Sequence, residues 1–318
     1  MGSLGLRQAT KPLDRQHQPL HGRSHWLSVP AIVSAGEGIA ATQEAKEAVD
    51  VENDRVFRGS IPALYDQYLG PMIFAPYADD LAARLADLRD GSVLETAAGT
   101  GVVTRALVST LPRSVFIVAT DLNRPMLDHA SSQFASDRVT WQQADAQMLP
   151  FPDGMFDVVV CQFGVMFFPD KPRAFAEAAR VLKPGGRFLF SVWDRIEENE
   201  FADVVVKAVA VLYPHDPPMF LARTPHGHYD AAALETQLRT AGFGTTSVES
   251  LTRKSMAPDA LSVAIGYCQG TPMRNEIEAH GAEALAAATQ AAASAIAAQY
   301  GSGPVTGRIR AHVITAMR

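Results

Sequence analysis

The stretch "VLETAAGTG", Val93 to Gly101, decides the fold class of this 318-residue chain. An apolar run ends on the acid Glu95 and passes directly into small residues, which is typical of a strand that turns sharply beside a ligand. Gly99 and Gly101 let the backbone turn and approach a bound molecule with no Cβ in the way. Phosphate-binding loops and nucleotide-cofactor folds both use this device, so the stretch alone leaves the ligand open.

Strand-like and helix-like segments alternate around that stretch. The helix-like segments are "GVVTRALVSTL", "RPMLDHASSQF" and "PRAFAEAARVL", and between them lie the strand-like runs "SVLET", "SVFIVATD", "RVTWQQAD", "MFDVVVCQFG" and "RFLFSVW". Strands that are apolar throughout are expected where both faces of a parallel sheet are covered. The pattern therefore predicts an α/β fold with a doubly wound, mostly parallel sheet.

The segments on either side of this core have a different pattern. Residues 1–51 have no sustained period and are expected to form a disordered extension, whereas residues 52–90 are predicted to form a helical cap, broken by Pro71 and Pro76. Residues 91–195 form the predicted core. Residues 196–318 are predicted to add lid helices, with one long Ala-rich helix from Arg274 to Gln299, and closing strands, of which the last is "GRIRAHVITAM".

Composition excludes several classes of protein. The net charge is −6, which disfavours a nucleic-acid partner, and no apolar run is long enough for a membrane span. Cys161 and Cys268 lack metal-ligand spacing, so we expect two buried thiols in a reducing compartment, no metal site and a cytoplasmic location. The basic residues near the start leave an organelle-transit interpretation open, and His17, His21 and His25 are not expected to form a site: Pro19 interrupts their helical spacing.

Four predicted strands end in residues suited to binding a ligand. Glu95, Asp121, Asp145 and the pair Gln162–Phe163 stand at these ends. In an open parallel sheet, ligands bind in the crevice outside the carboxyl ends of the strands. Asp121 stands where an acid that binds ribose hydroxyls is expected.

The glycine pattern separates the candidate cofactors. A dinucleotide fingerprint needs a third glycine, but the register here gives Gly99, Gly101 and then Thr104. Glu95 beside the turn is a poor neighbour for a pyrophosphate and a good one for a ligand that carries amino and sulfonium cations. The P-loop pattern is absent, since no Gly-Lys-Ser/Thr follows.

Four motifs in register resemble a known family. The segments "VLETAAGTG", "ATDLNRPML", "QQADAQMLPFPDGMFDVVVCQFGVMFFPD" and "RVLKPGGRFLFSVW" are similar to the class I S-adenosylmethionine-dependent methyltransferases, in the ubiquinone/menaquinone-biosynthesis-like (methyltransferase type 11) group. The resemblance covers roughly Tyr65 to Gly244. It implies a Rossmann-like, seven-stranded sheet with helical lid insertions, S-adenosylmethionine as cofactor, and residues 91–195 as its binding core.

The resemblance also implies which residues hold the cofactor. Its methionine part would lie against Glu95 and the loop residues Ala97, Gly99, Thr100 and Gly101, with Tyr65 as a candidate for its carboxylate. Asp121 would take the ribose hydroxyls. The adenine and the sulfur would be bordered by Leu122, Met126, Asp145, Ala146, Gln162 and Phe163. One departure is Ala97, which stands where the family usually has glycine.

The methyl acceptor cannot be read from the motifs. The segment "PPMFLART" and the pair Phe167–Phe168 favour a small, partly apolar molecule, with O, N or C as the accepting atom. A general base is needed only for some acceptors, and the candidates are His215, His226 and His228. The Ala-rich helix would let a homodimer form. Two alternatives stay open: a protein that binds S-adenosylmethionine without turnover, and an NAD-dependent dehydrogenase.

Overall fold

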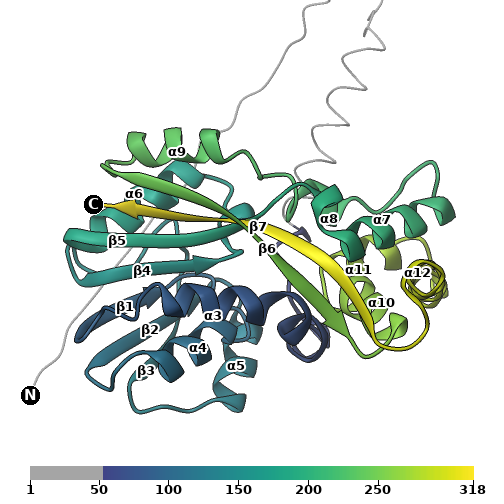
Figure 1. Ribbon diagram of the computed structural model, residues 1–318, viewed down its shortest axis with the longest axis horizontal. Coiled ribbons are helices and arrows are strands. Elements are labelled where there is room, and N and C mark those ends of the chain that lie inside the picture. The colour runs from purple at the N-terminus through teal and green to yellow at the C-terminus, as the bar shows by residue number, and fades with distance from the viewer. Residues whose placement is uncertain (1–52) are drawn as a thin grey trace, which may run out of the picture. The chain divides into compact units, whose positions relative to one another are not determined.

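The computed structural model describes residues 53–318 (Figure 1). The predictions for residues 1–51, including the disordered extension, the transit interpretation and the three N-terminal histidines, lie outside these residues. Within residues 53–318, no helix has the length and apolar character that a membrane crossing requires. Cys161 and Cys268 are buried free thiols, as predicted.

One seven-stranded sheet organises the chain. Its strand order is β3-β2-β1-β4-β5-β7-β6. Strands β1 to β5 pair in parallel, and β7 is antiparallel to both β5 and β6. The bounds are β1 Gly91–Glu95, β2 Val115–Asp121, β3 Val139–Gln143, β4 Phe156–Gln162, β5 Leu182–Trp193, β6 Thr246–Ala257 and β7 Val305–Met317. The predicted doubly wound, mostly parallel sheet is confirmed.

Helices cover both faces of the sheet, which explains why its central strands β1, β4 and β5 are largely apolar. Helices α3 (Ala75–Ala83) and α4 (Val102–Thr110) pack on the face that holds Val93, Ile117 and Val160. On the opposite face, Phe175 of α6 (Lys171–Val181) contacts Phe188 and Phe190 of β5. Helix α9 (Ala231–Thr240) lies beside α6, and α5 (Arg124–Gln133) lies beside β2 and β3 (Figure 1).

The N-terminal cap differs from its prediction. Pro71 does not break the helix: α2 (Ile61–Leu64) runs into a π-helix, η1 (Tyr65–Phe74), and then into α3. The Ala75 N–H bonds to the Gly70 carbonyl, five residues back, and this wider turn keeps Pro71 within the helix. Pro76 lies in the first turn of α3, where a missing N–H costs little.

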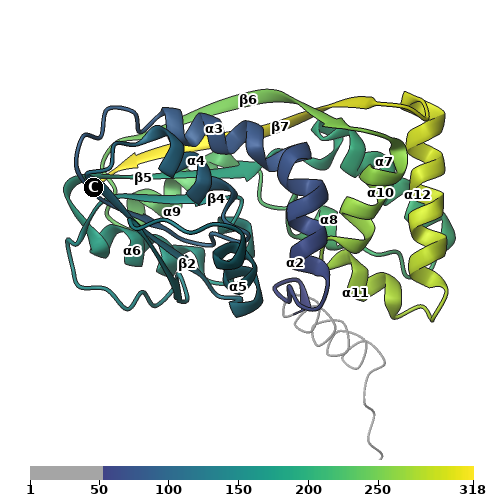
Figure 2. The ribbon, with the colours of Figure 1, turned by 90° about the horizontal axis from the view of Figure 1, so that it is seen from below.

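The lid is helical, but its elements differ from those predicted. The Ala-rich stretch is two helices, α11 (Met273–Glu278) and α12 (Ala284–Tyr300), and α10 (Ala260–Gln269) precedes them. Helices α7 (Glu200–Leu212) and α8 (Phe220–Arg223) complete this group, which lies beside the outer halves of β6 and β7 (Figures 1 and 2). The alanine side of α12 is buried within the chain against α10, so the homodimer stays a prediction.

Candidate functional site

The glycine loop after β1 is tied to the end of β2. The Gly99 N–H donates to Asp121 Oδ2 (2.9 Å), and the Asn123 N–H donates to Asp121 Oδ1 (2.7 Å). Gly99 and Gly101 have φ of +56° and +80°, a conformation that favours glycine. A Cβ on Gly101 would lie 2.7 Å from Trp141 Cη2, so this position also needs glycine to let the loop approach.

A cavity of about 710 Å³ opens at this edge of the sheet, and we call it the sheet-edge cavity. Most residues predicted to bind the cofactor line it: Tyr65, Ala97, Gly99, Asp121, Leu122, Met126, Asp145, Ala146, Gln162 and Phe163. The remaining lining residues were not predicted as cofactor-binding, and they are Arg55, Phe57, Asn123, Ala144, Gln147, Gly164, Phe167, Phe168 and Pro169. The structure thus gathers the strand-end motifs around one hollow.

Glu95, Thr100 and Gly101 are the predicted residues that do not line this cavity. Glu95 is only 2% exposed, and its Oε2 accepts a hydrogen bond from Thr104 Oγ1 (2.6 Å). The pKa of Glu95 is raised to about 8, mainly by burial and also by the nearby charge of Asp121, while the hydrogen bond from Thr104 opposes the change. Glu95 therefore supports the loop from behind the cavity wall.

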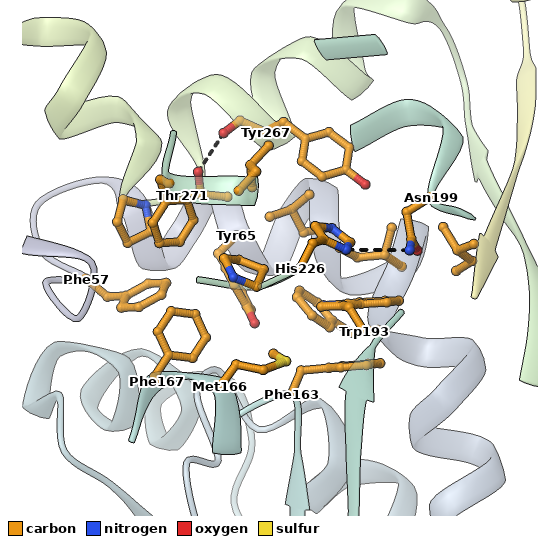
Figure 3. A pocket seen from close by; sticks show the side chains of 18 residues that line it. Phe57, Tyr65, Phe163, Met166, Phe167, Trp193, Asn199, His226, Tyr267 and Thr271 are labelled. Carbon is orange, nitrogen blue, oxygen red and sulfur yellow. Dashed lines mark hydrogen bonds between the residues drawn. The ribbon is translucent and has the colours of Figure 1, made fainter. Parts of the chain in front are cut away.

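A second cavity of about 520 Å³ lies beneath the lid, and we call it the inner cavity (Figure 3). Its wall is mainly aromatic and aliphatic, and none of its lining residues is Asp, Glu, Lys or Arg within the described part of the chain. Four residues border both cavities: Phe57, Tyr65, Phe163 and Phe167. The two cavities therefore share a wall.

Phe163 is the most constrained residue of that shared wall. It has φ of +52°, which is unusual for a bulky residue and marks a backbone held by its surroundings. Its ring stacks on Trp193 at 3.7 Å between centroids, with 2° between the planes, and meets Tyr77 edge to face at 5.4 Å. Phe163 is thus fixed as a partition between the cavities.

Tyr65 begins the π-helix and also faces both cavities. Its ring stacks on Phe74 at 4.7 Å between centroids and meets Phe57 edge to face at 5.9 Å. Burial raises the pKa of the Tyr65 hydroxyl well above its usual range, and the charge of Asp121 adds to that effect. The hydroxyl therefore stays protonated and can donate a hydrogen bond.

The three candidate histidines lie in different surroundings. His226 lines the inner cavity and is 6% exposed, and burial lowers its pKa to about 4. His215 is exposed in the loop between α7 and α8. His228 borders neither cavity: its Nε2 lies 3.4 Å from Lys171 Nζ, and burial lowers its pKa to about 4. Of the three, only His226 can meet a ligand in a described cavity.

Sequence reasoning missed the contribution of the first residues of the cap. Arg55 lines the sheet-edge cavity, and its Nε is buried with no hydrogen-bond partner among residues 53–318. Phe57 borders both cavities. These residues lie in a stretch without a motif or periodic pattern, so the sequence carries no signal for them beyond one cation and one aromatic ring.

Comparisons with known proteins agree with this geometry. A family model described as a methyltransferase domain matches residues 94–190. The ubiquinone/menaquinone biosynthesis C-methyltransferase UbiE of Pseudomonas aeruginosa is 31% identical over 182 residues, 53% of this chain and 71% of that protein. UbiE of Saccharophagus degradans is 29% identical over 64% of this chain and 82% of that protein. The chain belongs to the class I S-adenosylmethionine-dependent methyltransferases, in the UbiE-like group.

A solved structure shares the fold of this methyltransferase. Phosphoethanolamine N-methyltransferase 2 of Haemonchus contortus, in complex with S-adenosyl-L-methionine, superimposes with a TM-score of 0.52 at 16% identity. The match covers 81% of this chain and 56% of that chain. At this level of identity the likeness concerns the fold alone.

The sheet-edge cavity of the methyltransferase fits S-adenosylmethionine. Asp121 and Asp145 present carboxylates at two neighbouring strand ends, where ribose and adenine can donate hydrogen bonds. Gln162 Oε1 is buried with no partner in the described part of the chain, so it offers an acceptor to a ligand amino group. Gly99 leaves open the space between the loop and Met126, since a Cβ there would lie 3.7 Å from Met126 Cε.

Ala97 is accommodated by a glycine on the opposite loop. Ala97 has φ of +54°, although it carries a side chain. A Cβ on Gly164 would lie 2.4 Å from Ala97 Cβ and 2.7 Å from Cys161 Sγ, so Gly164 must lack a side chain for Ala97 to fit. The methyltransferase therefore accommodates Ala97, in place of the glycine usual in the family, because Gly164 has no side chain.

Proposed function

We propose that this methyltransferase transfers the methyl group of S-adenosylmethionine to a small, uncharged and partly apolar molecule bound in the inner cavity, by in-line displacement. The single observation that carries this proposal is the wall that the inner cavity shares with the sheet-edge cavity. A donor on one side and an acceptor on the other meet at that wall. Water is excluded there by aromatic side chains.

The nucleotide half of the cofactor is held at the strand ends. Asp121 accepts hydrogen bonds from the ribose hydroxyls, and its carboxylate is already oriented by the Gly99 and Asn123 N–H groups. Leu122 and Met126 pack on the adenine. Further along the rim, the adenine edge meets the Asp145 carboxylate and the Ala146 N–H.

The methionine half lies deeper, near the shared wall. The Arg55 guanidinium and the Tyr65 hydroxyl hold the donor's carboxylate, because Arg55 is the one cation of the described cavity lining and its Nε lacks a partner there. Gln162 Oε1 accepts from the amino group. Glu95 and Thr100 do not contact the cofactor. They stabilise the glycine loop whose backbone borders it.

The protein's part in the chemistry is to position the reactants. When bound, S-adenosylmethionine supplies an electrophilic methyl group on a sulfonium. Phe163 and Tyr65 set the distance and direction between the donor and the acceptor, and orienting reactants in this way removes several kcal/mol from a barrier. The aromatic wall keeps water from competing as nucleophile.

The name of the relatives favours carbon as the accepting atom. UbiE is described as a C-methyltransferase of ubiquinone and menaquinone biosynthesis, and both relatives above carry that name. An inner cavity lined by eight Phe, Tyr and Trp rings suits a planar ring as acceptor. We therefore extend the proposal to a ring carbon of a quinone-like molecule. The carbon gains the methyl group while the S–CH3 bond breaks and leaves its electron pair on sulfur, and the ring hydrogen leaves as a proton that the neutral His226 ring can accept.

This proposal gives each segment of the chain a role. Residues 91–195 form the cofactor-binding core, and residues 52–90 form a cap whose π-helix faces both cavities. Residues 196–318 supply the substrate lid and the closing strands. No nucleic acid takes part, and the acceptor is a small molecule.

The test uses methyl-labelled S-adenosylmethionine with a metabolite extract as acceptor source. We expect an uncharged aromatic metabolite to gain one labelled methyl group, with S-adenosylhomocysteine released in equal amount. Binding of the donor, seen by calorimetry, without release of S-adenosylhomocysteine in any extract would favour a binding protein without turnover. Binding of NAD in place of the donor would favour a dehydrogenase.

A further inference from the structure

Arg55 has no ion pair of its own to fix its position. It lines the sheet-edge cavity, its Nε is buried without a partner, and within residues 53–318 its guanidinium pairs with no acid. A long side chain of this kind has many conformations open to it, and ordering it costs entropy. The position of the guanidinium therefore depends on how the backbone on either side of Arg55 is held.

Asp54, the preceding residue, is bound to the lid. It is only 2% exposed, and its carboxylate accepts two hydrogen bonds from the Arg223 guanidinium, Nη2 to Oδ1 (2.6 Å) and Nε to Oδ2 (3.1 Å). The Thr224 hydroxyl also donates to Oδ2. A guanidinium that forms two bonds with one carboxylate fixes its direction as well as its distance. The backbone at Asp54 is therefore held against α8.

Arg223 is itself held within the lid. Its Nη2 also donates to Glu276 Oε1 in α11 (2.5 Å). Glu276 Oε2 accepts from the backbone N–H groups of Met219 (2.6 Å) and Phe220 (3.0 Å) at the start of α8. Glu276 thus joins α11 to α8 and orients Arg223 toward Asp54. Loss of the Asp54 charge would leave Arg223 paired with Glu276, so these lid contacts do not depend on Asp54.

Phe57 holds the backbone on the other side of Arg55. Its ring meets Tyr65 and Phe167 edge to face, each at 5.9 Å between centroids. These rings belong to the wall that the two cavities share. Arg55 thus lies between polar contacts with the lid at Asp54 and apolar contacts with the shared wall at Phe57.

We propose that Asp54 is a positioning residue for the methyl donor: its ion pair with Arg223 holds the Arg55 guanidinium where it binds the carboxylate of S-adenosylmethionine. This inference rests on the proposed function, in which Arg55 holds that carboxylate. Asp54 lines neither cavity, so it acts through its neighbour. None of the described residues beyond 195 lines the sheet-edge cavity, and Arg223 therefore influences donor binding from outside the cofactor site.

The test compares two ligands that differ only in the carboxylate, S-adenosylmethionine and decarboxylated S-adenosylmethionine. Calorimetry on the full chain measures both affinities, and their ratio reports on carboxylate binding alone. We expect the wild type to bind S-adenosylmethionine about 30-fold more tightly, as the loss of hydrogen bonds to a charged group predicts. Arg55→Gln should lower this ratio to about threefold, with the Tyr65 hydroxyl left. Asp54→Asn keeps the shape and removes the charge, and it should lower the wild-type ratio at least about threefold.

Two further variants show whether Asp54 acts through Arg55. In the Arg55→Gln background, adding Asp54→Asn should leave the ratio unchanged, because the group that Asp54 positions is already gone. Arg223→Lys keeps the positive charge but cannot form two bonds with one carboxylate, so its ratio should lie between those of the wild type and Asp54→Asn. This milder change also tests the inference if Asp54→Asn does not fold.

Asp80→Asn is the matched control for the loss of an ion pair. Asp80 pairs with Arg84 (2.6 Å) and Arg253 (3.0 Å), its side chain is 17% exposed, and it lines neither cavity. This variant should lower the unfolding temperature and keep the wild-type ratio.

The outcomes for the variants and for the wild type bear on different claims. A wild-type ratio in both Asp54→Asn and Arg223→Lys would overturn the inference. Equal weakening of both ligands in Asp54→Asn, or a further fall of the ratio in the double variant, would do the same, because either result means that Asp54 does not act through Arg55. A wild type that binds neither ligand, or binds both equally, would overturn the proposed function and the inference with it.

Discussion

The two cavities of this methyltransferase are built in opposite ways. The sheet-edge cavity uses strand ends, backbone N–H groups and acids, and most of its lining comes from the continuous core between residues 97 and 169. The inner cavity uses side chains of helices and strands from Phe57 to Ile309, and almost all of them are apolar. The cavity proposed to bind the cofactor is thus local in sequence, and the cavity proposed to bind the acceptor is dispersed over the chain.

The largest effect that separates the two cavities is expected at Asp121. Asp121→Ala removes the carboxylate proposed to bind both ribose hydroxyls, and hydrogen bonds to a charged group contribute about 1.5–3 kcal/mol each. We expect calorimetry to show at least about 100-fold weaker binding of S-adenosylmethionine. Binding of 2-naphthol, an uncharged aromatic probe for the inner cavity, should change by less than about twofold, since Asp121 does not line the inner cavity.

Asp153→Ala is the matched control for that change. Asp153 lies in the turn before β4, its side chain is 77% exposed, and it pairs with Arg180 outside both cavities. Its affinity for S-adenosylmethionine should equal that of the wild type. If Asp121→Ala weakened the two ligands equally, the cavities would not be separate sites.

The contact between Ala97 and Gly164 should give the next largest effect. Gly164→Ala places a methyl group against Ala97 Cβ and Cys161 Sγ, and overpacking of this kind costs about 2–3 kcal/mol. Adding Ala97→Gly should recover part of the loss in urea unfolding. Gly303→Ala, where nothing lies within 4 Å of an added Cβ, should leave stability nearly unchanged. Equal stability of Gly164→Ala and Gly303→Ala would contradict the clash.

Glu95, on the cofactor side, should make the stability of the folded protein depend on pH. Its pKa is about 8 in the folded chain against 4.5 for an ordinary glutamate side chain, so folding favours the protonated form. The stability that this proton contributes is complete below pH 4.5 and is lost as the pH rises through 8. Glu95→Gln cannot ionise, so at pH 9 it should be more stable than the wild type.

The measurement is the unfolding temperature of both proteins at pH 5, 7 and 9. The unfolding temperatures of the wild type and of Glu95→Gln should nearly coincide at pH 5 and diverge toward pH 9. Glu283→Gln, at an exposed position, serves as the control and should follow the wild-type curve. A constant difference between Glu95→Gln and the wild type at all three values would show that Glu95 does not titrate in this range.

The smallest effect is expected at Trp193, on the acceptor side. Trp193→Leu removes the ring that stacks on Phe163, and aromatic pairs of this kind contribute about 0.5–1.5 kcal/mol. Calorimetry should show 2-naphthol binding weakened by about threefold to tenfold, with S-adenosylmethionine unaffected. Phe116→Leu, whose parent side chain is 59% exposed, should change neither affinity. Loss of S-adenosylmethionine binding in Trp193→Leu would mean that the partition at Phe163 depends on this stack.

The sequence predicted the cofactor half of the molecule well because its signals are local. Apolar strands followed by Glu95, Asp121 and Asp145 specify which strand ends meet at the sheet edge, and glycine positions specify the turn. The depth of each residue was hidden, since a pattern of residue types does not distinguish the cavity lining at Asp121 from the buried support at Glu95, and Arg55 and Phe57 carried no signal.

The acceptor half could not be predicted for a physical reason. His226 and His228 lie two residues apart in one loop, and only packing of distant helices decides which of them meets the inner cavity. Pro71 is expected to end an α-helix, but tertiary packing selected a π-helix in which it fits. Helix α10 is rich in small residues and has little periodic signal, so it was missed.

The pairing of β6 with β7 has a consequence for how such a protein can change. These strands stay in register from Thr246–Ala316 to Ala257–Val305, so residues 258–304 leave and re-enter the sheet at adjacent points. An insert whose ends are adjacent can be lengthened, shortened or exchanged while its host keeps folding. This segment, which includes Tyr267 of the inner cavity, also packs against α7 and η1, so exchanging it between relatives would test whether it sets the acceptor while the cofactor side stays unchanged.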